Sequence, residues 1–544
     1  MSLYESIIRD PNRKFFVLTG LTAFLLLLVT ALYPFTMDQS VYQTMAVQLV
    51  QFHRLPYVGS WDMNFPGIVF IHSLAILLFG NTDTGFRILD IIVHVGIVLM
   101  LYRLVIRWTS PRTAFIVSIV LCLLYISGGD GSTGQREGFA AFFTLVVTML
   151  LYRIKDRAIS NQPQTGDIFT CVVIGVFAAC ACWVRPTYGL FAVIIAVALW
   201  KLPLPGAPKR VAAFLLGSLI LIAAVILPFA SKPGALNALY LATIRFNIDI
   251  YGSSRYRSPL TEAFYQGAEL FVDAVLLVFL IIYFALKKHS TNRGFHNVTG
   301  FDRFDRYLFI AYYVAARVSI LVMGKFFRHH YEMLLILTSI LLAFLLDIAV
   351  PLIKQKSTRT IVLWAVIVLF LFATFPWRVL QWFVDGMTQP GPTVEYVHNQ
   401  FSTFYHRDNV QNLALTNYIL SRTVTTDRVE LCSENPEFIW KSEREPATRF
   451  TMIFPLVMHR GEGGFTDYQL NWRKEFVDSL TAVLPKYIVL AREHKSFLNF
   501  LSQPPNVLMH EIPKFDTFLT TNYQYDTTLH DFEIYRNVRD STTR

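Results

Sequence analysis

Long apolar runs recur along the first 377 residues of the sequence, separated by short polar loops. Eleven of them are candidate membrane spans: 16–33, 85–106, 112–127, 138–152, 168–184, 186–200, 211–229, 264–286, 306–323, 331–350 and 359–377. A helix needs about 20 apolar residues to cross a bilayer, and a chain that repeats such runs can satisfy its backbone there only as helices. Only 16% of the residues are charged, whereas soluble domains have about 25%. The pattern predicts an α-helical polytopic membrane protein with about eleven transmembrane helices.

The basic residues of the short loops indicate how these spans are oriented. If residues 66–80 lie in the membrane interface instead of crossing it, one side collects Arg9, Arg13, Lys14, Arg103, Arg107, Arg112, Arg153, Lys155, Arg157, Lys201, Lys209, Arg210, Lys287, Lys288, Arg293, Lys354, Lys356 and Arg359. Loops rich in Lys and Arg stay cytoplasmic. We therefore expect a multi-pass protein of the inner (plasma) membrane with a cytoplasmic amino terminus and an extracytoplasmic carboxyl terminus. Because these loops hold most of the cations, the net charge of +10 does not indicate a nucleic-acid partner.

The character of the chain changes after residue 377. Residues 378–544 are polar and rich in loops, with short runs at 429–432, 487–490 and 532–535 that read as strands alternating with helices. Trp472, Phe476, Leu480 and Val483 recur at helical spacing and predict one amphipathic helix. We expect two domains: a transmembrane catalytic domain at 1–377 and a soluble extracytoplasmic α/β domain at 378–544 that acts as a lid or a platform for acceptor recognition.

The first outer loop, residues 34–84, is where chemistry is expected to concentrate. Its start predicts an amphipathic helix on the membrane surface, because Val41, Met45 and Leu49 repeat opposite a polar face of Ser40, Thr44, Gln48 and Gln51. Asp38 precedes these residues, five positions after the first span ends. A turn-rich aromatic segment at 55–62 follows, of the kind that holds functional groups. Asp38 is thus a candidate catalytic carboxylate, although Asp is also favoured as a helix N-cap.

Several cations lie on the predicted outer side, although Lys and Arg of short loops are usually cytoplasmic. Their position therefore needs an explanation. These cations are Arg136, Arg185, Arg245, Arg255, Arg257, Lys325 and Arg328. An anionic ligand explains them, since guanidinium groups bind phosphate through paired, charge-assisted hydrogen bonds. Each residue also has a structural explanation. Glu137 starts a span, where the helix dipole stabilises an acid, and Arg185 could snorkel to the headgroups. His329 and His330 could be interface residues, because no further Cys or His cluster supports a zinc site.

The order of these residues resembles the polytopic glycosyltransferases of the C superfamily (GT-C), close to the protein O-mannosyltransferases and the lipid A aminoarabinose transferases. Asp38-Gln39 resembles the acidic pair of the family's first outer loop, and residues 61–66, WDMNFP, resemble an aromatic signature that leads into a short interfacial helix. Further positions match in order: Arg87, the acidic Glu137, the basic Arg185, the pair Arg245-Phe246, and the basic, tyrosine-bearing stretch from Lys325 to Tyr331. The resemblance covers about residues 38–350.

The resemblance implies a transferase that moves a sugar from a polyprenyl-phosphate donor to a hydroxyl of a lipid, glycan or protein acceptor at the outer membrane face. We expect inversion with Asp38 as the base and with Glu137 as a second catalytic carboxylate that either shares the acceptor or orients Asp38. The expected substrate-binding residues are Tyr57, Asp62, Asn64, Arg87, Arg185, Arg245, Arg257, Lys325, Arg328, His330 and Tyr331. Two positions depart from the family: Asn64 replaces a lysine expected near the donor phosphate, and Met63 stands where some relatives have a metal-binding acid. We therefore expect no certain cofactor and no metal site.

Three other functions compete with this prediction. An oligosaccharide ligase or polymerase would use a diphosphate-linked glycan. A transporter or flippase of an anionic lipid would also need outer cations, but it should carry polar groups near the bilayer midplane, where Arg317 and Asp273 are the main candidates. A structural scaffold leaves the charged outer loops unexplained.

Overall fold

The computed structural model describes residues 10–160, 166–252, 301–352, 377–388, 407–459, 464–492 and 503–539, with scattered positions elsewhere between 357 and 400 and at 501. The chain forms two compact units. Unit 1 comprises Met1–Tyr33, Arg87–Ala223 and Arg257–Gln381, and unit 2 comprises Pro34–Phe86, Ala224–Tyr256 and Trp382–Arg544. The first outer loop thus groups with the carboxyl-terminal residues, and the predicted domain division at residue 377 stays a prediction.

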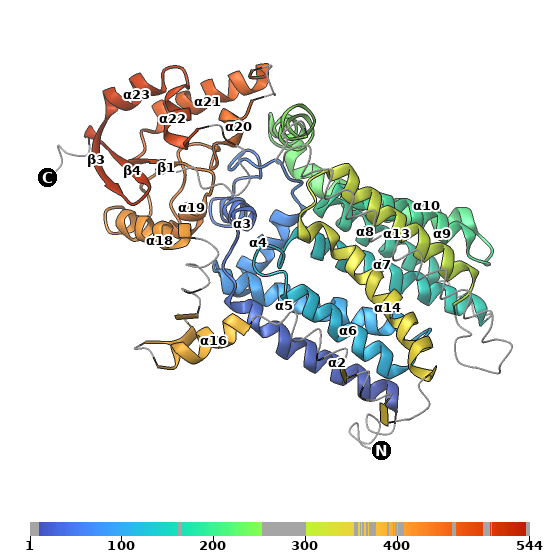
Figure 1. Ribbon diagram of the computed structural model, residues 1–544. Coiled ribbons are helices and arrows are strands. Elements are labelled where there is room, and N and C mark those ends of the chain that lie inside the picture. The colour runs from blue at the N-terminus through green and yellow to red at the C-terminus, as the bar shows by residue number, and fades with distance from the viewer. Residues whose placement is uncertain are drawn as a thin grey trace. The chain divides into compact units, whose positions relative to one another are not determined.

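Long apolar helices make up most of unit 1 (Figure 1). In chain order the helices are α2 (Pro11–Leu27) with η1 (Leu28–Leu32), α5 (Asp83–Val105), α6 (Pro111–Ile126), α7 (Arg136–Ile159), α8 (Gly166–Val184), η2 (Pro186–Tyr188), α9 (Gly189–Lys201), α10 (Ala207–Ala230), α13 (Arg303–Met323), η5 (Arg328–Tyr331) and α14 (Glu332–Leu352). Helix α5 begins, and α10 ends, within unit 2.

Seven helices within the described residues are long and apolar enough to cross a membrane, and three shorter apolar ones accompany them. Every predicted span that lies in the described residues coincides with one of these helices. The predicted span 264–286 lies outside the described residues, as does most of 359–377. The ambiguous run at 66–80 forms α4 (Gly67–Phe79), whose 13 residues fall short of the ~20 that a crossing helix needs. A polytopic helical protein is confirmed, while the number of spans stays a prediction.

Helices α8 and α10 cross at two glycines. A Cβ on Gly175 would lie 1.9 Å from the carbonyl oxygen of Phe214, and one on Gly217 would lie 2.0 Å from that of Val172. Ser218 Oγ donates to Gly175 O across the same crossing at 3.1 Å. Small residues let helix backbones approach closely in membranes, where no hydrophobic effect drives helices together. These glycines therefore determine how α8 packs on α10.

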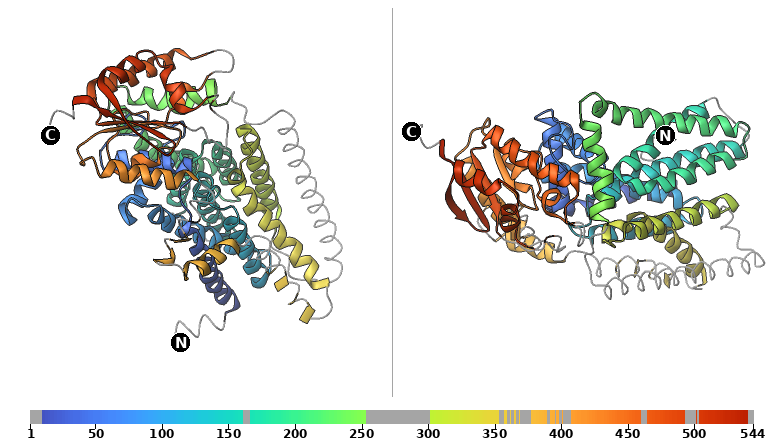
Figure 2. Two further views of the ribbon diagram at one scale, coloured as in Figure 1. Left: turned by 60° about the vertical axis from the view of Figure 1, so that its left-hand side comes forward. Right: turned by 90° about the horizontal axis from the view of Figure 1, so that it is seen from above.

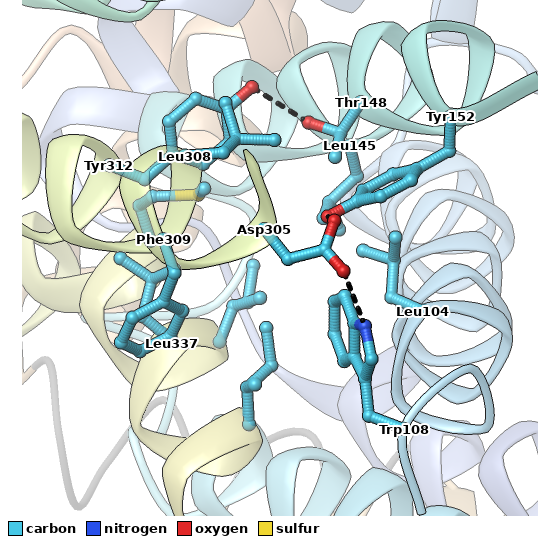
Figure 3. Close-up of a pocket in the computed structure, with 13 residues that line it drawn as sticks. Leu104, Trp108, Leu145, Thr148, Tyr152, Asp305, Leu308, Phe309, Tyr312 and Leu337 are labelled. Atoms are coloured by element: carbon cyan, nitrogen blue, oxygen red, sulfur yellow. Dashed lines mark hydrogen bonds between the residues drawn. The ribbon is translucent and has the colours of Figure 1, made fainter. Parts of the chain in front are cut away.

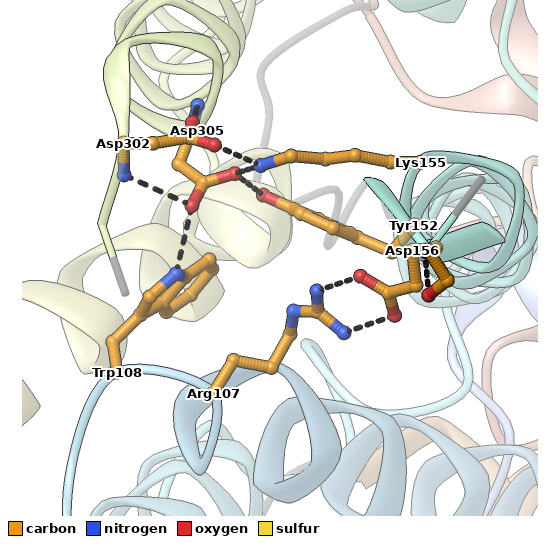
Figure 4. Close-up of polar contacts among 8 residues, drawn as sticks. Arg107, Trp108, Tyr152, Lys155, Asp156, Asp302 and Asp305 are labelled. Carbon is orange, nitrogen blue, oxygen red and sulfur yellow. Dashed lines mark hydrogen bonds and ion pairs between the residues drawn. The ribbon is translucent and has the colours of Figure 1, made fainter. Parts of the chain in front are cut away.

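A buried ion-pair network joins α7 to the start of α13 (Figure 4). Asp305, near the start of α13, is 2% exposed and accepts from Lys155 Nζ at 2.5 Å, Trp108 Nε1 at 3.0 Å and the Tyr152 hydroxyl at 3.1 Å. Lys155 also pairs with Asp302 at 2.8 Å. Lys155 was one of the cations expected in the cytoplasmic loops. Its contacts show that it also ties α7 to the start of α13.

Unit 2 combines the first outer loop, the stretch after α10 and the carboxyl-terminal region. It contains α3 (Met37–Val50), α4, α11 (Ala235–Tyr240), the π-helical turns η3 (Leu241–Arg245) and η4 (Asn247–Tyr251), α18 (Arg407–Leu420), α19 (Glu437–Ser442), α20 (Phe454–Val457), α21 (Asp467–Val483), α22 (Pro505–His510) and α23 (Phe515–Asn522). Helix α16 (Trp377–Gly386) spans the boundary between the two units.

The carboxyl-terminal residues of unit 2 fold around a four-stranded sheet of order β1-β2-β4-β3. The strands are β1 (Val429–Cys432), β2 (Tyr487–Ala491), β3 (Tyr523–Leu529) and β4 (Phe532–Asn537). Strands β1 and β2 are parallel and the other pairs antiparallel. Helices α18 and α19 pack on one face, while α21, α22 and α23 lie over the other (Figures 1 and 2). The three predicted strands are confirmed, and β3 was missed because its polar, largely uncovered edge lacks an alternating apolar pattern.

Helix α3 corrects one expectation. Its apolar face is buried as predicted, but Ser40, Thr44 and Gln48 on the polar face are buried too. Helix α19 packs against α3, and Thr44 Oγ1 donates to the carbonyl oxygen of Pro436 at 3.4 Å. The prediction of a water-facing polar side was therefore wrong for these three residues, whereas Gln51, the fourth residue of that face, is exposed. Hydropathy could not reveal that a segment almost 400 residues away in sequence covers that side.

Candidate functional site

Asp38 lies in the first turn of α3 without capping it. Thr36 is the N-cap, and it forms a capping box with Gln39: Gln39 N donates to Thr36 Oγ1 at 3.5 Å and Thr36 N donates to Gln39 Oε1 at 3.1 Å. The alternative that Asp38 is the cap is therefore wrong. Among the residues that the structure describes, none makes a hydrogen bond or ion pair with its half-buried carboxylate. The group is held on a helix and remains available to a ligand.

The WDMNFP segment that follows is held rigidly within unit 2. Trp61 is fully buried, lies edge to face on Phe246 and Trp472 at 4.8 and 5.8 Å between ring centroids, and donates its backbone N–H to Arg449 O at 2.7 Å. Asn247 Nδ2 donates to Met63 O at 2.7 Å. Contacts with residues 246–247, Arg449 and Trp472, all distant in sequence, thus hold the loop in this conformation.

Three predicted binding residues in this loop hydrogen-bond to one another. Asp62 Oδ1 accepts from Met63 N at 2.8 Å and from Asn64 Nδ2 at 3.1 Å. The fully buried Tyr57 donates its hydroxyl to Asn64 O, and Asn64 Nδ2 also reaches the Tyr42 hydroxyl at 3.3 Å. Asn64, which stands where the family has a lysine, therefore stabilises the loop. Direct contact of these residues with a substrate stays a prediction.

Arg245, also predicted to bind the donor, lies on the surface of unit 2 at the end of the first π-helical turn. Its side chain is 48% exposed and pairs locally with Asp249, with Nη2 3.0 Å from Oδ2. π-Helical turns are rare and occur preferentially at functional sites. Arg257, its predicted companion, lies outside the described residues.

A second set of predicted residues converges in unit 1 around Glu137. This glutamate is 1% exposed in the first turn of α7. Arg185, directly after α8, places Nε 3.2 Å from Glu137 Oε1, and His330 Nε2 lies 3.9 Å from the same oxygen. Tyr188 donates its hydroxyl to Glu137 O at 3.4 Å. The prediction treated Glu137 and Arg185 as separate groups, whereas they form one buried cluster with His330.

The remaining predicted cations of unit 1 have different surroundings. Arg87 is fully buried, with Nε donating to Tyr33 O and Nη1 to Thr133 O, both at 3.0 Å, so it ties the end of η1 to the loop before α7. Arg328 is exposed and donates to Leu124 O and Ser127 Oγ. Lys325 is buried and Tyr331 half-buried beside the η5 turn. Arg87 therefore stabilises the fold, and donor binding by it and the others stays a prediction.

One polar network in the spans escaped the sequence analysis. His94 Nδ1 lies 3.1 Å from Asp90 Oδ1, its Nε2 lies 3.5 Å from Glu332 Oε1, and its ring stacks on Tyr125 at 3.5 Å. The Tyr125 hydroxyl donates to Asp90 at 2.8 Å and accepts from Gly134 N at 2.7 Å. Ionisable residues inside an apolar run are the signal that could have revealed this network. The network fixes Glu332, and with it the adjacent η5 turn that carries His329 and His330.

A small, mostly apolar pocket lies beside the Asp305 network (Figure 3). Its lining includes Trp108, Tyr152, Asp305 and Tyr312, and Thr148 and Tyr312 hydrogen-bond across it at 2.9 Å. The polar groups that line it are already paired, which favours packing at a helix junction over a binding site.

Comparisons with known proteins bear on the fold. No protein-family model and no curated protein matches the sequence. Among solved structures, ArnT from Cupriavidus metallidurans bound to undecaprenyl phosphate matches with 12% identity, covering 96% of this chain and 97% of that chain at a TM-score of 0.54. The apo state of ArnT matches with 11% identity, the same coverage and a TM-score of 0.53. An Archaeoglobus fulgidus oligosaccharyltransferase matches with 12% identity over 97% of this chain and 74% of that chain, at a TM-score of 0.47. Sequence identities this low establish only a shared fold, and the chain has the fold of ArnT, as the resemblance predicted.

Proposed function

We propose that this protein is a membrane glycosyltransferase that moves a sugar from a polyprenyl-phosphate donor to an acceptor hydroxyl. The observation that carries the proposal is the Asp38 carboxylate. It is half-buried, makes no polar contact with the described residues, and lies on a helix whose cap is supplied by other residues. Its position matches the acidic residue that the GT-C resemblance assigns to the first outer loop. The ArnT structure with undecaprenyl phosphate supports a lipid-linked donor in a shared fold.

The reaction would be a single displacement with inversion at the anomeric carbon. The acceptor oxygen bonds to that carbon while the bond from the carbon to the phosphate oxygen breaks. The acceptor proton passes to Asp38, and the electron pair of the broken bond leaves with the polyprenyl phosphate. Polyprenyl phosphate is a stable anion and needs no strong acid, so activation of the hydroxyl and stabilisation of the departing charge are the two tasks of the protein.

The cations are proposed to stabilise the departing phosphate. Arg245 is exposed and pairs with Asp249, and Arg328 uses one nitrogen for its two contacts in the described residues. A guanidinium group carries five N–H donors, so each can bind a phosphate oxygen while keeping its present contact. Arg185, Arg257, Lys325, His330 and Tyr331 remain candidates for the same role. Glu137 remains the candidate for a second carboxylate that shares the acceptor or orients Asp38.

The test is transfer by the Asp38→Asn variant. Purified protein is incubated with a panel of polyprenyl-phosphate sugars and acceptors, and release of polyprenyl phosphate is measured. General bases contribute roughly 10²–10⁴ in rate, so the variant should lose two to four orders of magnitude in turnover. Because Thr36 and Gln39 cap the helix, Asn at position 38 should leave folding intact.

The chain supplies a matched control at Asp467. That residue also lies in the first turn of a helix, α21, behind a capping box of Thr466 and Gln469. Asp467→Asn removes the same charge from the first turn of a similarly capped helix and should retain full turnover. Near-normal transfer by a folded Asp38→Asn protein would refute Asp38 as the base. A preference for diphosphate-linked glycans would identify the ligase or polymerase alternative, and lipid movement without sugar transfer would identify a flippase.

A further inference from the structure

Three potential metal ligands from two distant segments meet in unit 1. They are Glu137, in the first turn of α7, and His329 and His330, in the η5 turn before α14. One ligand atom of each lies within 4.8 Å of the others. All three side chains are at most 9% exposed. A single ion could therefore contact all three after small side-chain rotations.

The buried carboxylate of Glu137 has ion-pair partners in Arg185 and His330 but makes no hydrogen bond with the described residues. Neither oxygen accepts a hydrogen bond from any residue in the described part of the chain. Arg185 Nε is 3.2 Å from Oε1, in a geometry that does not form a hydrogen bond. A buried acceptor that makes no hydrogen bond is destabilising, even where nearby charges compensate it. Such a group marks a position where a bound ligand is expected to complete the site.

The ring of His329 is oriented as metal-binding histidines are. Its Nδ1 lies 3.3 Å from the carbonyl oxygen of Gly131. A carbonyl only accepts, so Nδ1 carries the proton and the lone pair is on Nε2. Histidines that bind metals commonly donate their other ring nitrogen to a backbone carbonyl or carboxylate, which fixes the tautomer.

We propose that Glu137, His329 and His330 bind one divalent transition-metal ion of the zinc class. Two imidazoles and a carboxylate are a donor set that zinc accepts, with the fourth position left for water or another ligand. Nitrogen donors argue against Mg²⁺ and Ca²⁺, which prefer oxygen. Arg185 competes for Oε1, so the ion takes Oε2 and binds more weakly than at a closed structural site. We expected no metal from the sequence because Met63 in the first outer loop stands where some relatives have a metal-binding acid. The ligands proposed here come from other segments.

The proposal is independent of sugar transfer and is tested by binding alone. The purified full-length chain is stripped with a chelator and titrated with Zn²⁺ by calorimetry, and with Co²⁺ by visible absorption. We expect one equivalent of metal per chain. His329→Ala, His330→Ala and the isosteric Glu137→Gln should each weaken Zn²⁺ binding at least tenfold, whereas His53→Ala, an exposed histidine of unit 2, should not.

A second measurement guards against variants that merely misfold. A ligand that binds only the folded state raises the apparent Tm, so Zn²⁺ should stabilise the parent and the His53→Ala variant but not Glu137→Gln. Binding of less than half an equivalent of Zn²⁺ by the parent chain would overturn the proposal. Unchanged affinity in both histidine variants would overturn it equally.

Discussion

Replacing Asp305 by asparagine tests the stability that the buried network of unit 1 provides. Asp305 accepts hydrogen bonds from Lys155, Trp108 and Tyr152 while only 2% exposed. Asparagine preserves the shape but cannot carry the charge that compensates Lys155. The side-chain amide also has an NH2 group in place of one carboxylate oxygen, so a hydrogen-bond donor then faces a donor of a neighbouring residue. The variant should therefore fold and be less stable.

The expected magnitude follows from what remains around Lys155. A hydrogen bond to a charged group contributes about 1.5–3 kcal/mol, and an ion left alone in the interior costs about 3–5 kcal/mol. Asp302 still pairs with Lys155 at 2.8 Å, but its side chain is 47% exposed and compensates only in part. We expect Asp305→Asn to lower the free energy of unfolding by about 2–4 kcal/mol, between these limits.

The assay is unfolding by SDS in mixed micelles, followed by tryptophan fluorescence. Asp156→Asn is the matched control, because Asp156 neighbours Lys155 on α7 and pairs with Arg107 while its side chain is 48% exposed. Exposed pairs contribute about 0–1 kcal/mol. The double variant Asp305→Asn/Lys155→Met removes the stranded charge and should recover at least about 1 kcal/mol relative to Asp305→Asn. If it is no more stable than Asp305→Asn, an uncompensated lysine is not the cause of the loss.

Three further predictions concern the carboxyl-terminal region, the orientation and the donor. Burial raises the pKa of Glu430 from 4.5 to about 8, so the folded state holds its proton more tightly than the unfolded one. The contribution of Glu430 to stability should be fully present below pH 4.5 and be lost as pH rises towards 8. The apparent Tm of the parent should therefore decline more steeply over this range than that of Glu430→Gln, and parallel pH profiles would contradict the assignment. Labelling from the extracytoplasmic side should reach Val58→Cys but not Lys209→Cys, both at exposed positions, and the reverse result would invert the orientation. Arg245→Ala should leave stability nearly unchanged, because the Arg245 side chain is 48% exposed, yet raise the KM for the lipid-linked sugar. An unchanged KM would remove Arg245 from the donor site.

The candidate site was only partly predictable, and the reason lies in the partners of each side chain. Sequence order singled out Asp38, Glu137 and Arg185, because charges near the ends of apolar runs are conspicuous. It could not tell that Thr36 caps α3 and leaves Asp38 available, since Thr36 and Asp38 both suit the cap. It also could not tell that Tyr57 and Asn64 bind each other. Which partner a hydrogen-bond donor or acceptor binds depends on the groups that pack against it in the folded protein.

The sequence by itself determined the helices of the membrane part, three of the four strands and the buried face of α21. These features follow from local hydropathy and periodicity, which neighbouring residues carry without help from the rest of the chain. Tertiary structure alone decided that α19 covers the polar face of α3, and that Glu137 meets His329 and His330. Both depend on contacts between segments far apart in sequence, where packing and the pairing of buried polar groups select one arrangement among many that hydropathy permits.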